Sequence, residues 1–174
     1  MIIGIDPGKF GAFCVMDGDS IEFIDMPITT EPFKKTRKEV IDLARVSDIL
    51  TEYVLDDPLV CLEHIWDFGA AAYGASSGSF VFARDYGGII GILRSLKLRF
   101  ILAAPQAWQR AHKKPKGTGK RWSIETAKRL FPQAQLIKPR CRVPSDGRAD
   151  ALLIASYARM KEVMTGYGKP LDLR

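Results

Sequence analysis

The sequence predicts an α/β fold in which a mixed five-stranded sheet is flanked by helices. Three short apolar runs separated by turn residues occupy the first 27 residues, a pattern typical of antiparallel strands. Two later apolar runs alternate with segments of helical periodicity. Strands that alternate with helices usually pair in parallel, so the two groups together predict a sheet with both kinds of pairing.

The first three strands are predicted from the runs IIGID, GAFCVM and IEFIDMP. Pro7 and Gly8 provide a turn between the first two runs, and the segment DGD at 17–19 separates the second from the third. Connections this short join strands that lie antiparallel. We therefore expect an antiparallel meander over residues 2–27.

The rest of the chain is predicted to alternate between helices and strands. LVCLEHI is almost continuously apolar, which indicates a strand buried on both faces, and RFILAAP gives the fifth strand. Ser123 begins a capping-box pattern and is the expected start of one helix. Helices are expected over residues 40–54, 80–96, 105–111, 123–131 and 146–164.

Length and composition indicate one soluble domain over residues 1–174. A domain commonly takes about 100 to 200 residues, and 47% hydrophobic with 26% charged residues is the composition of a globular protein. No apolar run approaches the roughly 18 residues needed to cross a bilayer, and no basic leader precedes the first strand. We therefore expect a cytoplasmic protein with no membrane partner. The three cysteines lack CxxC spacing, so packing is their expected role.

Positive charge is concentrated in one part of the chain, within a net charge of +6. The segment RAHKKPKGTGKRWSIETAKR at 110–129 carries eight basic residues and one acid, and KPRCRVPSDGR adds four more bases. Clustered bases favour a polyanionic partner such as nucleic acid, while a solvated surface loop is the alternative. The candidate nucleic-acid contacts are Arg110, Lys113, Lys114, Lys116, Lys120 and Arg121.

Four acids lie where the predicted strands and the last helix end or begin. Asp6 follows the first strand, Glu63 lies near the end of LVCLEHI, and Asp146 and Asp150 open the last helix. A turn residue, an edge-strand carboxylate and an N-cap would explain the first three. Asp150 is harder to explain, because the residues of ADALLIASYA around it should pack inward and a buried, unpaired carboxylate is costly.

The spacing of the last two acids favours a divalent metal. Asp146 and Asp150 are four residues apart, so on a helix they share one face and repel each other. A cation between them would remove this conflict, and Mg²⁺, with Mn²⁺ as a substitute, prefers oxygen ligands of this kind. Zinc would require a cluster of nitrogen and sulfur ligands, which this sequence does not offer. His64 points to the opposite face from Glu63 in a strand, so packing or hydrogen bonding is its expected role.

Three motifs in order, IIGIDPGKFGA, CLEH and GRADALLIASYA, resemble those of the RuvC-type Holliday junction resolvases, particularly their phage versions, in the RNase H-like superfamily. The resemblance spans about residues 1 to 160. It implies an RNase H-like sheet and a Mg²⁺-dependent endodeoxyribonuclease that cuts four-way DNA junctions with two metal ions. Asp6, Glu63 and Asp150 match the family's acids. The family usually places a further acid or histidine three residues before the last aspartate, whereas Asp146 lies four before, so it is either a ligand or an N-cap.

The resemblance also implies roles for residues outside the acidic set. Lys120 matches a family lysine near the scissile phosphate, and Trp66 matches an aromatic residue that stacks against an unpaired base at the branch point. Phe68 is a second candidate for stacking, and packing over its own sheet is the alternative for Trp66. Cutting two strands symmetrically requires two active sites, so a homodimer is expected. The helix around YGGIIGIL is either its interface or part of the core.

The sequence offers three other functions as alternatives. An actin-like kinase or ATPase shares a similar sheet and a D-x-G turn but binds nucleotide between two domains, and this chain has room for one. A non-catalytic nucleic-acid-binding module would use the basic segment and leave Asp150 unexplained. A nuclease of the same fold that acts on other branched or flap DNA, or on RNA–DNA hybrids, stays open.

Overall fold

The computed structural model describes residues 1–33, 36–64, 77–119 and 121–165. Its main sheet has five strands, and β1, β2 and β3 are antiparallel, while β6 and β7 run parallel to β1. The predicted α/β fold with a mixed sheet is therefore confirmed. The order of the strands across the sheet is β3 (Ser20–Asp25), β2 (Ala12–Asp17), β1 (Ile2–Ile5), β6 (Leu59–Glu63) and β7 (Arg99–Ala103).

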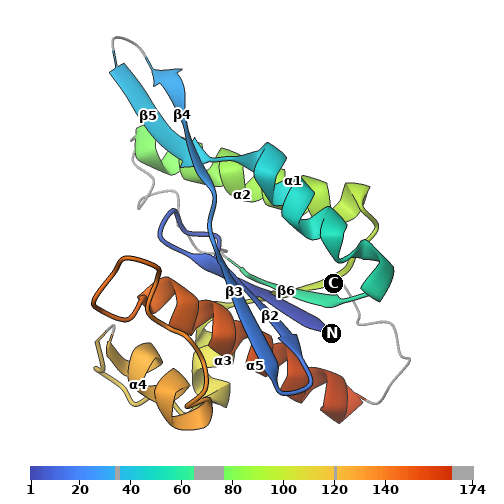
Figure 1. Cartoon of the computed structure of the whole chain (residues 1–174), viewed down its shortest axis with the longest axis vertical. Coiled ribbons are helices and arrows are strands. Elements are labelled where there is room, and N and C mark those ends of the chain that lie inside the picture. Colours follow the sequence, from blue (N-terminus) through green and yellow to red (C-terminus); the bar gives the residue numbers. More distant parts are fainter. Residues whose placement is uncertain (34–35, 65–76, 120, 166–174) are drawn as a thin grey trace.

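Helices cover both faces of this sheet, as Figure 1 shows. One face packs against α1 (Leu43–Glu52) and α2 (Ser77–Ser95), and its core includes Ile3, Ile5 and Phe13. The other face lies under α3 (Pro105–Ala111), α4 (Arg121–Leu130) and α5 (Asp146–Thr165). Cys14 and Cys61 are buried on this second face and unpaired, as expected for packing.

The longest helix, α5, rests directly on the backbone of β1. A Cβ atom added to Gly4 would lie 2.2 Å from the Ala151 carbonyl oxygen and 2.5 Å from the Ala155 nitrogen. Only glycine therefore lets the helix approach β1 this closely. The contact fixes the first turn of α5 beside the carboxyl end of the central strands, where two of the predicted acids lie.

A hairpin that the sequence did not reveal precedes α1. Strands β4 (Ile28–Phe33) and β5 (Thr36–Ile41) pair with each other and project beyond the main sheet (Figure 1). The helix predicted over residues 40–54 is present as α1, but its predicted start was wrong, because Val40 and Ile41 are the buried end of β5 and α1 begins after its N-cap Asp42. Buried Asp85 of α2 holds this end by accepting a hydrogen bond from the Ile41 amide at 2.9 Å.

Two further boundaries carry information about function. The helix predicted at 105–111 matches α3, whereas α4 begins at Arg121, so Ser123 lies inside the helix and is not its N-cap. Ser123 is buried there, and its hydroxyl forms a hydrogen bond with the carboxyl of Asp150. In the ranges that the structure describes, no helix combines the length and apolarity needed to span a membrane.

Candidate functional site

The four predicted acids come together at one edge of the sheet. Asp6 directly follows β1, and Glu63 ends the neighbouring parallel strand β6, where Ile5 is paired with Leu62. Asp146 and Asp150 occupy the first two turns of α5. Asp6, Asp146 and Asp150 line one open pocket of about 510 Å³, and Glu63 is close enough for Asp6 and Asp150 to raise its pKa.

A compact turn between β1 and β2 holds Asp6 in place. The Gly8 amide donates a hydrogen bond to Asp6 Oδ1 at 3.0 Å, and the Gly11 amide donates to the Gly8 carbonyl at 2.8 Å. The start of α5 packs against this turn, because a Cβ atom on Gly147 would lie 2.2 Å from the Phe10 carbonyl oxygen. The turn and the helix therefore form one unit, which fixes Asp6 relative to Asp146.

Burial and mutual repulsion raise the pKa values of three of these acids. Burial raises the pKa of Asp6 to about 6, with a further increase from Asp146 and opposing effects from the Gly8 amide and Lys138. Burial and then the Asp6 charge raise the pKa of Glu63 to about 7. The same two causes raise the pKa of Asp150 to about 7. Without a cation, these carboxylates therefore resist being charged together at neutral pH.

Asp150 has one oxygen atom without a protein partner. Its Oδ1 atom is buried and makes no hydrogen bond with any described residue. A hydrogen bond from the Ser123 hydroxyl lowers the pKa of the same carboxyl. A buried acceptor without a donor is costly, and a cation would remove that cost. The orphaned oxygen is therefore the strongest local sign that this site binds a positive charge.

The donor set fits magnesium by its chemistry, although the acids are not yet arranged around an ion. All four side chains offer carboxylate oxygens, the ligands that Mg²⁺ prefers. Across the described ranges, no three His, Cys, Asp or Glu side chains are already grouped so that they could hold a metal ion. Mutual repulsion keeps uncompensated carboxylates apart, so binding would require these side chains to move closer together.

Asp146 is not the N-cap of α5. Ser145 has that role, because its Oγ atom accepts a hydrogen bond from the Arg148 amide at 3.3 Å and its carbonyl accepts from Ala149 at 3.2 Å. Asp146 is the first helical residue and lies in the lining of the pocket. The N-cap interpretation of this residue was therefore wrong, and its role as a metal ligand stays a prediction.

Two tryptophans, which the sequence did not single out, support the acids. Trp108 of α3 is 1% exposed and donates a hydrogen bond from Nε1 to Glu63 Oε1 at 3.0 Å. The ring of Trp122 lies beside it, with 6.1 Å between the centroids, and the Lys114 ammonium lies 5.3 Å from the centroid of Trp122. The charge of Lys114 also lowers the pKa of Asp150. Of the predicted basic contacts that the structure describes, Lys114 is therefore the one placed in the pocket lining.

A part-buried ion pair between Arg148 and Asp25 ties the segment before α5 to the sheet. Arg148 is 7% exposed and donates to both carboxylate oxygens of Asp25, at 2.9 Å and 3.1 Å. It also donates to the carbonyls of Gln135 and Ile137. Lys138 lies 3.2 Å from Asp25 and lowers the pKa of Asp6, so it is a cation next to the pocket that sequence reasoning missed.

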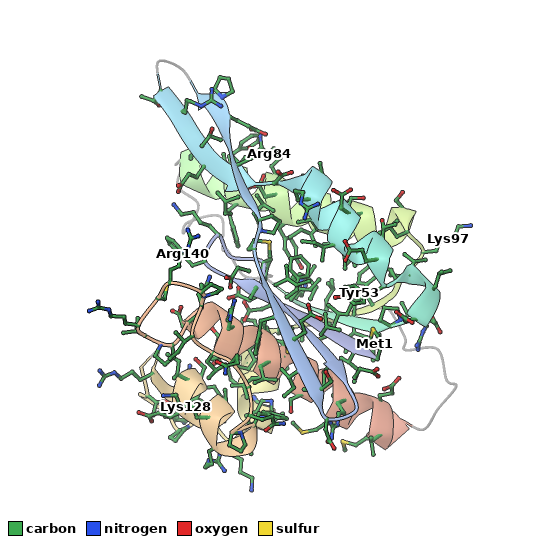
Figure 2. The ribbon with its side chains drawn as sticks, viewed as in Figure 1. Met1, Tyr53, Arg84, Lys97, Lys128 and Arg140 are labelled. Atoms are coloured by element: carbon green, nitrogen blue, oxygen red, sulfur yellow. The ribbon has the colours of Figure 1, made fainter. Side chains whose placement is uncertain are left out.

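The other predicted residues have simpler placements. Among the basic candidates, Arg110, Lys113, Lys116 and Arg121 are exposed. Figure 2 shows further basic side chains on this part of the surface, with Lys128 of α4 and Arg140 of the segment before α5 labelled. His64 forms a 2.8 Å hydrogen bond with the Tyr86 hydroxyl, which agrees with the expected structural role. Lys120, Trp66 and Phe68 lie outside the described residues.

Comparison with known proteins gives a match at the level of structure. No family model matches the sequence, and no curated protein matches it. The RuvC structure of Thermus thermophilus aligns over 98% of this chain and 99% of its own, with 15% identity and a TM-score of 0.54. The structure of T. thermophilus RuvC in complex with a Holliday junction substrate aligns over 98% of both chains, with 16% identity and a TM-score of 0.55. The fold implied by the resemblance is thus confirmed, because the chain has the same α/β fold as RuvC.

Proposed function

We propose that this protein is a metal-dependent endodeoxyribonuclease that cuts four-way DNA junctions by hydrolysing phosphodiester bonds. The observation that carries the proposal is the convergence of Asp6, Glu63 and Asp150, whose pKa values are raised to about 6 or 7. Acids that destabilise each other in this way usually serve a site and not the fold. The RuvC-like fold, seen in a protein solved with a Holliday junction substrate, supports the same function.

We place Mg²⁺, or Mn²⁺ as a substitute, with Asp6, Glu63, Asp150 and Asp146, most simply as a pair of ions. Bound there, the ions would supply an activated water and stabilise the charge on the leaving oxygen. The protein's part is to hold the oxygen ligands in place. The Gly8 amide, the Trp108 indole and the Ser123 hydroxyl each hold one carboxylate, so these donors set the orientation of the ligands.

The basic side chains around the pocket would bind the DNA backbone. Arg110, Lys113, Lys116 and Arg121 are exposed, and Lys114 lies in the pocket lining. Contacts with phosphates provide affinity and register but little sequence information, so the branched shape of the substrate would provide selectivity. Lys120 remains our candidate for a contact with the scissile phosphate, with Trp66 and Phe68 for stacking at the branch point.

A second candidate is a nuclease of the same fold that acts on flaps, other branched DNA or RNA–DNA hybrids. The basic side chains favour it equally, because phosphate contacts do not distinguish one branched shape from another. A non-catalytic binding module is less well supported, since it would leave the three perturbed acids without a purpose.

Cleavage assays separate these functions. Four-way, Y-shaped, flap and hybrid substrates are incubated with the protein in Mg²⁺, in Mn²⁺ and in EDTA, alongside an ATP-hydrolysis assay. We expect metal-dependent cuts in the four-way junction, and we expect Asp6→Asn and Asp150→Asn to abolish cutting while junction binding persists. Faster cutting of a flap or hybrid would favour the second candidate. Binding without cleavage of any substrate would leave only the binding module.

We also propose a homodimer, because symmetric cutting of a junction requires two active sites. On α2, Gly88 serves the core, since a Cβ atom there would lie 2.4 Å from Leu43 of α1. Gly87 and Gly91 have no described heavy atom within 4 Å of such a Cβ position, so their side of α2 is open. Light scattering at working concentration tests the proposal, and a mass equal to that of one chain would contradict it.

A further inference from the structure

An exposed phenylalanine lies at the mouth of the acidic pocket. Phe10, in the turn between β1 and β2, is 72% exposed and lines the same pocket as Asp6, Asp146 and Asp150. Single exposed apolar side chains are common on protein surfaces and need no function. Phe10 differs from other exposed apolar side chains in its position beside the pocket. Leu55, for comparison, is 98% exposed but lies in the 3₁₀ turn Val54–Asp56, which leads into the opposite end of β6.

The backbone under Phe10 is fixed on both sides. Gly11 has no room for a Cβ atom, which would lie 2.1 Å from the Asp6 carbonyl oxygen. Gly147 of α5 approaches so closely that its Cβ atom would lie 2.2 Å from the Phe10 carbonyl oxygen. The aromatic ring therefore projects from a turn whose backbone is fixed by close contacts. The same contacts hold Asp6 and Asp146 in place. A backbone held in this way needs little rearrangement when the ring binds a partner.

A positively charged side chain, Lys9, lies beside the Phe10 ring. The Lys9 ammonium lies 4.9 Å from the centroid of the Phe10 ring, a cation–π distance, and forms an ion pair with Glu39 of β5. Lys9 also lines the pocket, so one short turn presents an aromatic face and a positive charge beside the carboxylates. A nucleotide offers the matching groups, a flat base and a negative phosphate.

We propose that Phe10 stacks on an unpaired nucleobase next to the phosphate that is cut, while Lys9 neutralises the neighbouring backbone. This inference rests on the proposed function, because it identifies how the same pocket recognises its substrate. Stacking on an aromatic side chain tolerates any base, so the contact recognises an unstacked nucleotide and not a sequence. The turn would thus favour DNA whose bases are already unpaired near the cut, as at a branch point.

The test compares binding and base stacking in matched variants. Fluorescence anisotropy measures binding of a four-way junction in Ca²⁺, which takes oxygen ligands as Mg²⁺ does. A 2-aminopurine placed beside the mapped cleavage position reports stacking through its fluorescence. The variants are Phe10→Ala, Phe10→Leu, which keeps apolar bulk without a ring, and Phe10→Tyr, which keeps the ring. Leu55→Ala is the control for removing an exposed apolar side chain elsewhere.

Loss of the ring should weaken junction binding about 5- to 160-fold, the range expected for one stacked base. We expect Phe10→Ala and Phe10→Leu to show this loss together with a changed 2-aminopurine signal. Phe10→Tyr should stay within about twofold of wild type, and Leu55→Ala should match wild type. A wild type that binds and cuts junctions, with Phe10→Ala unchanged in both signals, would overturn the inference alone. A wild type that neither binds nor cuts any DNA would overturn the proposed function itself.

Discussion

Replacing Asp150 by asparagine should stabilise the metal-free protein at neutral pH. Its carboxyl is the group with a buried oxygen that lacks a partner among the described residues, and Asp6 and Asp146 both raise its pKa. The uncharged amide has almost the same shape but removes the negative charge. A substitution in a buried position normally destabilises a protein, so an increase in stability would be diagnostic.

The magnitude follows from the shift in pKa. A carboxyl whose pKa rises from 3.8 to about 7 on folding lowers the free energy of unfolding by about 4 kcal/mol once the pH exceeds both values. The hydrogen bond from Ser123 is weaker to an amide than to a carboxylate, which offsets about 1 kcal/mol. We therefore expect Asp150→Asn to raise the free energy of unfolding by about 3 kcal/mol at pH 8.

The pH dependence has a definite sign. Below about pH 4 the carboxyl is protonated in both states, and this contribution to stability is fully present. The folded state keeps the proton as the pH rises while the unfolded state loses it, so stability falls until the pH passes the folded value of about 7. The advantage of the asparagine variant should thus be small at pH 4 and largest at pH 8.

Urea unfolding followed by circular dichroism at pH 4, 6 and 8 in EDTA measures this effect. Asp19→Asn, in the exposed turn between β2 and β3, is the matched control and should leave stability unchanged. Added Mg²⁺ should stabilise the wild type more than Asp150→Asn. A variant that is less stable than wild type at pH 8 in EDTA would refute the claim that burial and repulsion of the Asp150 charge destabilise the folded protein.

Three further substitutions test how the site is supported. Trp108→Phe removes the hydrogen bond to Glu63 and leaves a small cavity where the indole was buried. Junction cleavage should fall at least tenfold while four-way junction binding stays near wild type, and equal loss of both would indicate a packing role. Gly4→Ala should destabilise the protein by about 3 kcal/mol or more in urea, because the added methyl meets the backbone of α5; a stability within error of wild type would disprove that contact. Asp25→Asn leaves buried Arg148 without its charged partner and should lower the unfolding free energy by about 3 kcal/mol. An unchanged free energy of unfolding would show that the hydrogen bonds from Arg148 to the Gln135 and Ile137 carbonyls hold this segment without the ion pair.

The strands and the meeting of the acids could be predicted because local patterns determine them. Continuous apolar runs mark the buried central strands, and the carboxyl ends of neighbouring parallel strands meet at one edge, which brings Asp6 beside Glu63. The first turns of α5 reach that edge because Gly4 admits the helix. The spacing of Asp146 and Asp150 then predicts a shared helical face, and both residues line the pocket.

The missed features depend on contacts between segments far apart in the chain. The β4–β5 hairpin is held by Asp85, 44 residues after its partner Ile41, so no local pattern predicts it. Ser123 fits a capping box, but α4 starts earlier and turns the hydroxyl to Asp150. Trp108 sits in the short helix α3, and its contact with Glu63 is a product of the tertiary fold.

The close packing of the Asp6 turn against α5 limits how this turn could be redesigned. Because Gly11 and Gly147 leave no room for a side chain and the Gly8 amide binds Asp6, inserting or deleting a residue would displace a carboxylate along with the loop. Lys9 and Phe10, by contrast, are exposed and can be exchanged without moving the backbone. Side-chain replacement at these two positions can therefore change the surface of the turn, while the length of the turn is constrained by the position of Asp6 and by α5.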